Sequence, residues 1–142
     1  MKLKIAVLPG DGIGPEVTNE SIKVLNCIAK KFNHEVEMNE GLVGAIAIDH
    51  HNNPYPDETH NLCLESDAIL FGAIGDPKYD NDPKAKIRPE QGLLEMRKKL
   101  GLYANLRPTL VFDSLLHMSP IKEERITGTD ILFVRELTGG IY

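Results

Sequence analysis

The sequence contains no tryptophan, only two cysteines and an aromatic content of 6%. Cys27 and Cys63 match no spacing typical of a metal site or a redox pair, so we interpret both as reduced residues in or near the core of a cytoplasmic protein. No apolar run approaches the length of a membrane span, and the first strand-like run is too soon interrupted for a secretory signal. The sequence therefore predicts a protein with no membrane partner.

An excess of positive charge is also lacking. The chain has 16 lysines and arginines against 21 aspartates and glutamates, which gives a net charge of −5. A chain without a basic field is not typical of proteins that bind nucleic acid. Its 142 residues, 42% hydrophobic and 26% charged, are typical of a globular protein with its own core.

Short apolar runs alternate with helical patterns along the first half of the chain. Residues 3–8 and 68–73 predict buried strands, and residues 34–39 predict a weaker one. A helix is predicted from Pro15, with one buried stripe formed by Val17, Ser21, Val24, Leu25, Ile28 and Phe32. The order strand, helix, strand predicts an α/β fold with a mostly parallel sheet and flanking helices.

The remaining segments are predicted with less regular structure. We expect a short helix over 41–49, a polar turn at His50 and His51, and a helix over 57–65 that is capped by Asp57 and buries Leu62. Residues 75–88 predict a long charged loop, and residues 111–120 a connection with strand or turn character. Residues 130–135 predict a strand that is buried on both faces, because apolar side chains occupy both.

The glycine-rich loop PGDGIGPE at 9–16 precedes the first helix. Its glycine spacing is not that of a dinucleotide-binding fingerprint, and no lysine follows as in a phosphate-binding loop. A tight turn between strand and helix is the plainer interpretation of this motif.

The stretch RPEQGLLEMRKKLGLYANLRP at 88–108 is the most distinctive of the chain. It predicts a helix over 92–100 that ends at Gly101, followed by a strand over 103–107. On that helix Leu93, Leu94 and Arg97 are neighbours, and the strand presents Arg107. Two guanidiniums and two leucines suit a small acid that has carboxylates at one end and a branched apolar group at the other. The alternative is a solvated basic helix face, with Arg107 paired to a surface acid.

Together with VRELTGGIY at 134–142, these stretches resemble the metal-dependent decarboxylating hydroxy-acid dehydrogenases, the isocitrate/isopropylmalate dehydrogenase family. The resemblance runs from Lys4 to Tyr142 and is to the amino-terminal part of longer enzymes. It implies the two-domain fold of this family, with residues 1–102 in the first domain and 103–142 at the start of the second. Because the chain stops just after a predicted turn, we expect it to be truncated.

The resemblance also implies roles for individual residues. The substrate carboxylates would be held by an arginine clamp of Arg97, Arg107 and Arg135. The hydrocarbon branch of the substrate would contact Glu90, Leu93 and Leu94, and Tyr142 would assist proton transfer after decarboxylation. The nicotinamide cofactor NAD would lie near Ile13, Gly75, Asp76, Pro77, Lys78, Arg88 and Glu90.

The implied partners are a small hydroxy-dicarboxylate substrate and, in the complete enzyme, a second identical subunit. A Mg²⁺ or Mn²⁺ ion is implied as well, with ligands beyond residue 142 and none in this chain. Within the family, Leu93 and Leu94 favour a hydrocarbon branch over the third carboxylate of isocitrate. A relative acting on homoisocitrate or tartrate stays open, as does a truncated chain that binds anions without catalysis.

Overall fold

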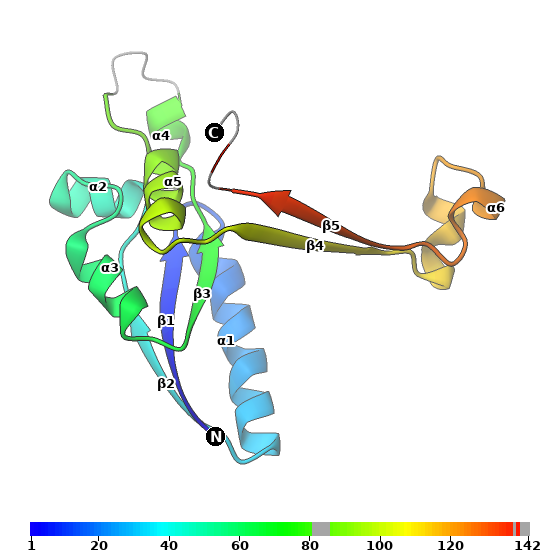
Figure 1. Cartoon of the computed structure of the whole chain (residues 1–142), viewed down its shortest axis with the longest axis horizontal. Coiled ribbons are helices and arrows are strands. Elements are labelled where there is room, and N and C mark those ends of the chain that lie inside the picture. The colour runs from blue at the N-terminus through cyan, green and yellow to red at the C-terminus, as the bar shows by residue number, and fades with distance from the viewer. Residues whose placement is uncertain (81–85, 138, 140–142) are drawn as a thin grey trace. The chain divides into compact units, whose positions relative to one another are not determined.

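A computed structural model describes residues 1–80, 86–137 and 139 of the chain. The chain divides into two compact units, Met1–Leu100 and Gly101–Tyr142, and each is described here by itself (Figure 1). None of the described helices is both long and apolar enough to cross a membrane. The assignment of these units to the two domains that the resemblance implies stays a prediction.

The first unit is built on a parallel sheet of three strands. These are β1 (Lys2–Gly10), β2 (Glu35–Glu40) and β3 (Ala68–Ala73), in the order β2-β1-β3 (Figure 1). The central strand β1 pairs with both neighbours, so that Ile5 lies opposite Met38 on one side and Ala68 on the other. The predicted mostly parallel sheet is confirmed.

Helix α1 (Gly14–Lys31) packs on one face of this sheet with a different stripe from the predicted one. Its inward stripe comprises Gly14, Thr18, Ile22, Leu25 and Ala29, of which Gly14, Thr18 and Ala29 are buried. The predicted stripe is wrong apart from Leu25: Val24 is 63% exposed and Phe32 is 56% exposed. Small inward residues let the helix lie close to the strands, and the larger apolar residues occupy the neighbouring face. Cys27 is exposed for the same reason, contrary to prediction.

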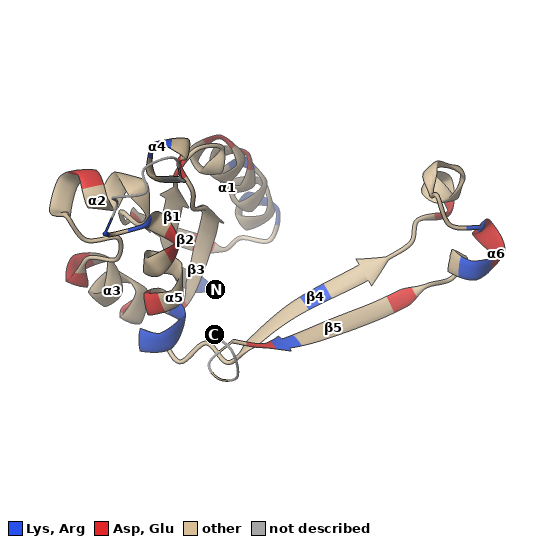
Figure 2. Ribbon diagram, turned by 90° about the horizontal axis from the view of Figure 1, so that it is seen from above, with Lys and Arg blue, Asp and Glu red and all other residues tan. Residues whose placement is uncertain are grey.

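The other face of the sheet is covered by helices α2 (Ala45–His51), α3 (Asp57–Leu64) and α5 (Pro89–Lys99) (Figures 1 and 2). The core between these layers is formed by Ala6, Leu8, Val43, Tyr55, Cys63 and Met96. Tyr55 is fully buried, and its hydroxyl lies 3.1 Å from Nδ1 of His60. Burial raises the pKa of Tyr55 far above its ordinary value, so this phenol stays neutral. The prediction that Cys63 is a core residue is confirmed.

Three details of these helices differ from the sequence-based expectation. Helix α2 extends through His50 and His51, which we expected in a turn. Asp57 is the first helical residue of α3 and follows the capping position, so it does not cap the helix; Leu62 is only half-buried. A further short helix, α4 (Pro77–Asp80), begins the segment that we expected to be a loop.

Helix α5 begins earlier than predicted because Pro89 occupies its first turn, where a missing N–H is tolerated. The N–H of Arg88 donates a hydrogen bond of 3.0 Å to Oε1 of Gln91, which satisfies the start of the helix. Gly101 follows the last turn in the left-handed conformation, with φ of 64°. The predicted end of this helix at Gly101 is confirmed.

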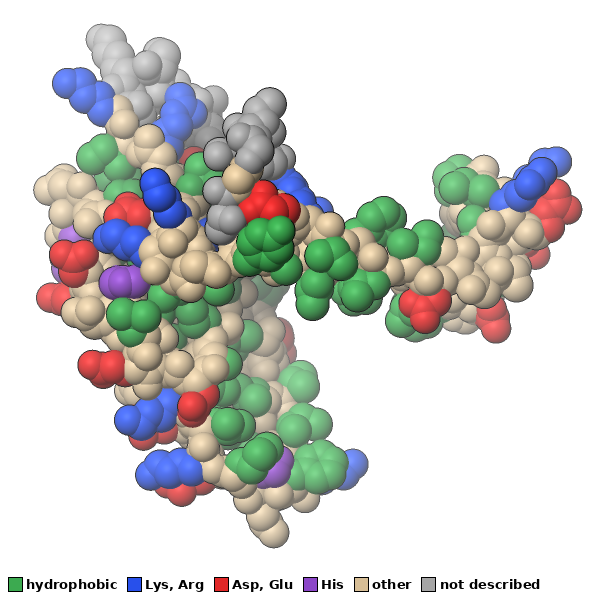
Figure 3. Space-filling model, in the orientation of Figure 1, with side chains coloured by type: hydrophobic (Ala, Val, Ile, Leu, Met, Phe, Trp, Pro, Cys, Tyr) green, Lys and Arg blue, Asp and Glu red, His purple; other side chains and the backbone are tan. Residues whose placement is uncertain are grey.

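The second unit is a long antiparallel hairpin of β4 (Ala104–Leu110) and β5 (Asp130–Glu136). A 3₁₀ helix, η1 (Asp113–Met118), and helix α6 (Glu123–Ile126) lie between the strands. We expected strand or turn character over 111–120, so the helical turn of η1 differs from that expectation. The β5 strand is confirmed, but its predicted burial on both faces is wrong: Phe133 is 54% exposed and Val134 is 64% exposed. Figure 3 shows hydrophobic side chains on the surface of the hairpin. Two strands offer no second layer within this unit, so both faces meet solvent.

Candidate functional site

The loops at the carboxyl edge of the parallel sheet enclose a cavity of about 560 Å³. This edge, where parallel strands end, is the usual ligand-binding region of open α/β sheets. The cavity is lined by residues of the β1–α1 loop, the end of β2, helix α2 and the segment after β3. They are Pro9, Gly10, Asp11, Gly12, Pro15, Asn19, Glu40, Gly41, Leu42, Ala45, Ile46, Asp49, His50 and Asp76.

The glycine-rich loop forms one wall of this cavity and is a tight turn, as its spacing indicates. Gly10 has a φ of 73°, and a side chain there would collide with the carbonyl of Ala73 at the end of β3. The next residue, Asp11, donates its backbone N–H to the same carbonyl at 2.7 Å. The first glycine of the motif therefore allows close packing of backbone on backbone.

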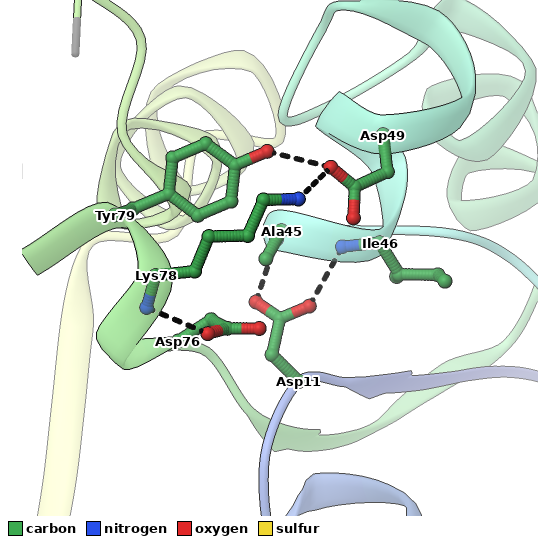
Figure 4. A network of polar contacts seen from close by, with 7 residues as sticks. All are labelled: Asp11, Ala45, Ile46, Asp49, Asp76, Lys78 and Tyr79. Carbon is green, nitrogen blue, oxygen red and sulfur yellow. Dashed lines mark hydrogen bonds and ion pairs between the residues drawn. The ribbon is translucent and has the colours of Figure 1, made fainter. Parts of the chain in front are cut away.

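The carboxylate of Asp11 joins three segments at the cavity floor. Its side chain is buried and accepts hydrogen bonds from the backbone N–H groups of Ala45 at 2.6 Å, Ile46 at 2.9 Å and Gly75 at 3.3 Å. The two bonds to α2 are drawn in Figure 4. Gly44, with φ of 85°, is needed where α2 begins, because any side chain there would strike this carboxylate. Asp11 thus satisfies the free amides at the start of α2 from a distant loop.

A second carboxylate, Asp49 on α2, lies above the first (Figure 4). It accepts a hydrogen bond of 2.6 Å from Nζ of Lys78 and one of 2.8 Å from the hydroxyl of Tyr79, both on α4. The hydrogen bond from Lys78, and to a smaller extent that from Tyr79, lowers the pKa of Asp49. In return, the bond to Asp49 raises the pKa of Lys78 and of Tyr79. The backbone N–H of Lys78 also donates to Oδ1 of Asp76 at 2.9 Å.

The residues that the resemblance places near NAD lie on several elements of the first unit. Ile13 is 57% exposed at the start of α1, and Gly75 is bonded to Asp11. A side-chain carbon at Gly75 would lie 3.8 Å from Oε1 of Glu90, so the segment after β3 approaches the first turn of α5. Asp76 lines the cavity. Four of the other predicted contacts are exposed: Pro77, Lys78, Arg88 and Glu90. Their role in binding the cofactor stays a prediction.

Helix α5 separates the two leucines that we expected on one face. Its buried face consists of Pro89, Gly92 and Met96, and Leu93 packs beside it against the hydrophobic core. Leu94 is 50% exposed. The outward face follows the helical spacing of Glu90, Leu94 and Arg97. Leu94 is therefore available to a ligand, whereas Leu93 already contacts the core.

In the second unit, the hairpin places Arg107 and Arg135 on one face. Asn105 pairs with Arg135 across the strands, and Arg107 lies two residues further along β4. Figure 2 colours the Lys and Arg positions of both strands blue. Nε of Arg107 donates to Oδ1 of Asn105 at 3.0 Å. Arg97, the third predicted member of the clamp, is half-buried in the last turn of α5 in the first unit. Tyr142 lies outside the described residues.

Sequence reasoning missed Asp11, Asp49 and Tyr79. Asp11 offered no reliable signal, because an aspartate between two glycines favours a bond to nearby backbone, whereas its carboxylate accepts amides of Ala45, Ile46 and Gly75 far along the chain. Asp49 offered none, because its partners Lys78 and Tyr79 are about thirty residues further along the chain. Within residues 1–80, 86–137 and 139, no group of three or more His, Cys, Asp or Glu side chains is placed to hold a metal ion.

The fold agrees with the family comparison. The model of the family described as "Isocitrate/isopropylmalate dehydrogenase" matches residues 4–142, so the chain belongs to the isocitrate/isopropylmalate dehydrogenase family. The predicted family and fold class are confirmed.

Within the family, the chain is similar to individual proteins with one name. The chain is 54% identical over 142 residues to the 3-isopropylmalate dehydrogenase of Bacteroides fragilis and 56% identical to that of Bacillus subtilis. It is matched over its full length and covers 40% and 39% of those proteins, respectively. The chain therefore spans about two fifths of the length of these relatives.

Two solved structures share the fold. A β-decarboxylating dehydrogenase of Thermococcus kodakarensis, in its apo form, is 32% identical with a TM-score of 0.65, and the match covers 94% of this chain and 33% of that one. The isocitrate dehydrogenase of Methylococcus capsulatus is 25% identical with a TM-score of 0.72, and the match covers 98% and 36%, respectively.

Proposed function

We propose that this chain forms part of an NAD-dependent 3-isopropylmalate dehydrogenase. The reaction is the oxidative decarboxylation of 3-isopropylmalate to 4-methyl-2-oxopentanoate in leucine biosynthesis. The observation that carries the proposal is the 54–56% identity, over the full chain, to two relatives with that name. The isocitrate dehydrogenase among the solved structures is 25% identical.

The substrate carboxylates are bound by arginines. Arg107 and Arg135 share one face of the hairpin, and Arg97 ends the outward face of α5. A guanidinium matches a carboxylate with two parallel N–H groups, which fixes the orientation of the acid as well as its charge. Each charge-assisted bond contributes about 1.5–3 kcal/mol net.

The hydrocarbon branch of the substrate is recognised by Leu94, with Glu90 beside it on the same helix face. Half of the Leu94 side chain is exposed, and burying a methylene-sized group against it contributes about 0.8 kcal/mol. Isocitrate would present a third carboxylate to this face. The negative charge of Glu90 and the apolar Leu94 both disfavour that group, so the face supports the isopropyl branch.

In this proposal the nicotinamide dinucleotide lies between the segment after β3 and the first turn of α5; of its predicted contacts among the described residues, Asp76 lines the cavity. Asp76 and Glu90 provide carboxylates of the kind that accept hydrogen bonds from ribose hydroxyls, and the exposed Ile13 provides an apolar contact. Gly75, Pro77, Lys78 and Arg88 would border the cofactor in this proposal. When bound, NAD supplies the acceptor for the hydride that leaves the hydroxyl-bearing carbon of the substrate.

The residues of this chain then hold the acid while the remaining bonds change. Loss of the hydride and of the hydroxyl proton gives a β-keto acid, and its C–C bond breaks to release carbon dioxide and leave an enol. The arginines keep the remaining carboxylate in place, and Tyr142 assists protonation of the enol carbon. The Mg²⁺ or Mn²⁺ ion of the reaction takes its ligands from polypeptide outside the described residues. The complete enzyme is a cytoplasmic homodimer in this proposal.

A chimeric enzyme tests the proposal. Residues 1–142 replace the matching segment of the 3-isopropylmalate dehydrogenase of Bacillus subtilis, to which they are 56% identical. We expect the chimera to reduce NAD in the presence of 3-isopropylmalate and Mn²⁺, and the Arg107→Ala chimera to lose this activity. A folded chimera that prefers isocitrate, homoisocitrate or tartrate would contradict the proposed substrate.

A further inference from the structure

The segment Gly75–Tyr79 is attached to helix α2 at both of its ends. At one end the N–H of Gly75 donates to Asp11, whose carboxylate also accepts the first two amides of α2. At the other end Lys78 and Tyr79 both donate to Asp49, near the end of the same helix (Figure 4). Between them, Asp76 accepts the N–H of Lys78 and keeps the chain turned. We call this arrangement the two-carboxylate attachment.

We propose that Asp49 is a positioning residue, which together with Asp11 holds segment 75–79 against α2. The ammonium of Lys78 is then used within the protein and is not a free cation for a ligand phosphate. The consequence for cofactor binding rests on the proposed function, because only there does this segment border NAD. The attachment itself does not depend on that function.

The bonds at the Asp11 end of the segment are stronger than those at the Asp49 end. A substitution of Asp49 can therefore weaken the attachment without removing it. Asp11 is 6% exposed and its bonds to backbone amides are shielded from water. The ion pair of Lys78 and Asp49 has side chains that are 59% and 46% exposed, and exposed pairs are individually weak. Tyr79 adds a second donor to the same oxygen, Oδ1, and its aromatic ring lies under the ammonium of Lys78 at 5.1 Å. The Asp49 carboxylate, the Lys78 ammonium and the Tyr79 side chain together hold the short helix α4.

A segment that is already fixed loses less conformational freedom when a ligand orders it. Removing the Asp49 end should therefore weaken binding of the ligand that borders the segment, and leave other ligands nearly unaffected. For the carboxylate-to-amide change at Asp49 we expect about a fivefold weakening of that binding.

Limited digestion with trypsin tests the attachment without any assay of activity. Trypsin must take the ammonium of Lys78 into its own pocket, and in this structure Asp49 holds that ammonium. Asp49→Asn in the full chain should raise the rate of cleavage after Lys78 about fivefold. Tyr79→Phe, which keeps the ion pair and removes one bond, should give a smaller increase.

The chain offers a matched control in the pair Glu20–Lys23, which is also exposed and has the same distance of 2.6 Å. Glu20→Gln should leave cleavage after Lys78 unchanged. An unchanged rate at Lys78 in Asp49→Asn would overturn the proposal. An equal increase after Lys23 in that variant would overturn it as well, since Asp49 would then stabilise the whole unit and not this segment.

The chimeric enzyme then tests the consequence for the cofactor. In Asp49→Asn the KM for NAD should rise about fivefold, and by more than the KM for 3-isopropylmalate. Equal changes in both constants would contradict a positioning role at the cofactor. If the parent chimera is inactive, the proposed function fails, while the digestion still decides whether Asp49 holds the segment.

Discussion

Arg107 and Arg135 are diagonal neighbours on one face of the β4–β5 hairpin, with Asn105 beside the first and opposite the second. Diagonal positions in an antiparallel pair are separated by about 7–8 Å, which long side chains can span. In the proposed function, these two guanidiniums are the part of the arginine clamp that lies on the hairpin.

This relationship predicts the effect of Arg107→Lys in the chimeric enzyme. Lysine keeps the charge but loses the planar fork that pairs with a carboxylate. Loss of one charge-assisted bond, worth about 1.5–3 kcal/mol, should lower kcat/KM for 3-isopropylmalate by about 10- to 100-fold. The matched control is Arg125→Lys on helix α6, an exposed arginine outside the predicted clamp. Steady-state kinetics would exclude a bidentate role for Arg107 if the two variants behave alike.

The different environments of Leu93 and Leu94 give a second prediction. Leu94→Asn in the chimera should reduce the preference for 3-isopropylmalate over malate, which lacks the branch, by about 1–3 kcal/mol. Leu93→Ala should instead lower the free energy of unfolding by about 2 kcal/mol, because Leu93 packs against the core. Competition kinetics and urea unfolding measure the two effects. A change in substrate preference with Leu93→Ala alone would reverse these assignments.

Asp11 gives a prediction about stability. Asp11→Ala removes the acceptor of three backbone amides and leaves two of them at the start of α2 without their partner. We expect a loss of about 3 kcal/mol in the free energy of unfolding, measured by urea denaturation. Asp67→Ala is the control, since its exposed carboxylate accepts a single bond from the N–H of Lys4. Similar losses in both variants would show that Asp11 is no more than a surface acceptor.

Local patterns predicted the elements of this fold better than they predicted what each element buries. The strand over Ala68–Ala73 and the end of α5 at Gly101 follow from side-chain type and turn chemistry alone. The buried stripe of α1 was misplaced because two adjacent stripes satisfy the helical spacing. Hydrophobicity favoured the one containing Val24 and Phe32, whereas close packing on the sheet selected small residues.

In the candidate site, too, local patterns predicted some residues and missed others. Arg107 and Arg135 were identified from motifs, and the strand register then placed them on one face. The attachment of Asp49 to Lys78 and Tyr79 joins residues about thirty positions apart, and no periodicity within either segment indicates the other. Contacts of this kind depend on how α2 and α4 meet in three dimensions, so a single sequence does not reveal them.

The pKa of Asp49 predicts how its contribution depends on pH. Bonds from Lys78 and Tyr79 lower this pKa below the ordinary value of 3.8. A group with a lowered folded-state pKa stabilises the fold above its unfolded value and loses that contribution as the pH falls through the folded value. The difference in hydrogen-exchange protection of residues 75–79 between the parent chain and Asp49→Asn should therefore be constant from neutral pH to about 5 and vanish well below 3.8. A difference that grows on acidification would contradict this assignment.

The last prediction concerns the 142-residue chain by itself, which we expect not to oxidise 3-isopropylmalate at a measurable rate. Activation of the hydroxyl group needs a divalent ion as Lewis acid, and the described residues hold no group of three ligands for one. Removing one member of a set that acts as a unit abolishes most of the rate, not a proportionate share. The arginine-bearing hairpin also exposes both faces, and small misplacements of reacting groups are costly.

The purified chain is incubated with 3-isopropylmalate, NAD and Mn²⁺ while the absorbance of NADH is followed, with the chimeric enzyme as positive control. Only the chimera should produce NADH. Steady NADH production by the chain, dependent on substrate and abolished by Arg107→Ala, would show that these 142 residues suffice for the chemistry. The metal would then be bound by side chains of this chain. The proposal that its ligands lie outside the described residues would be wrong.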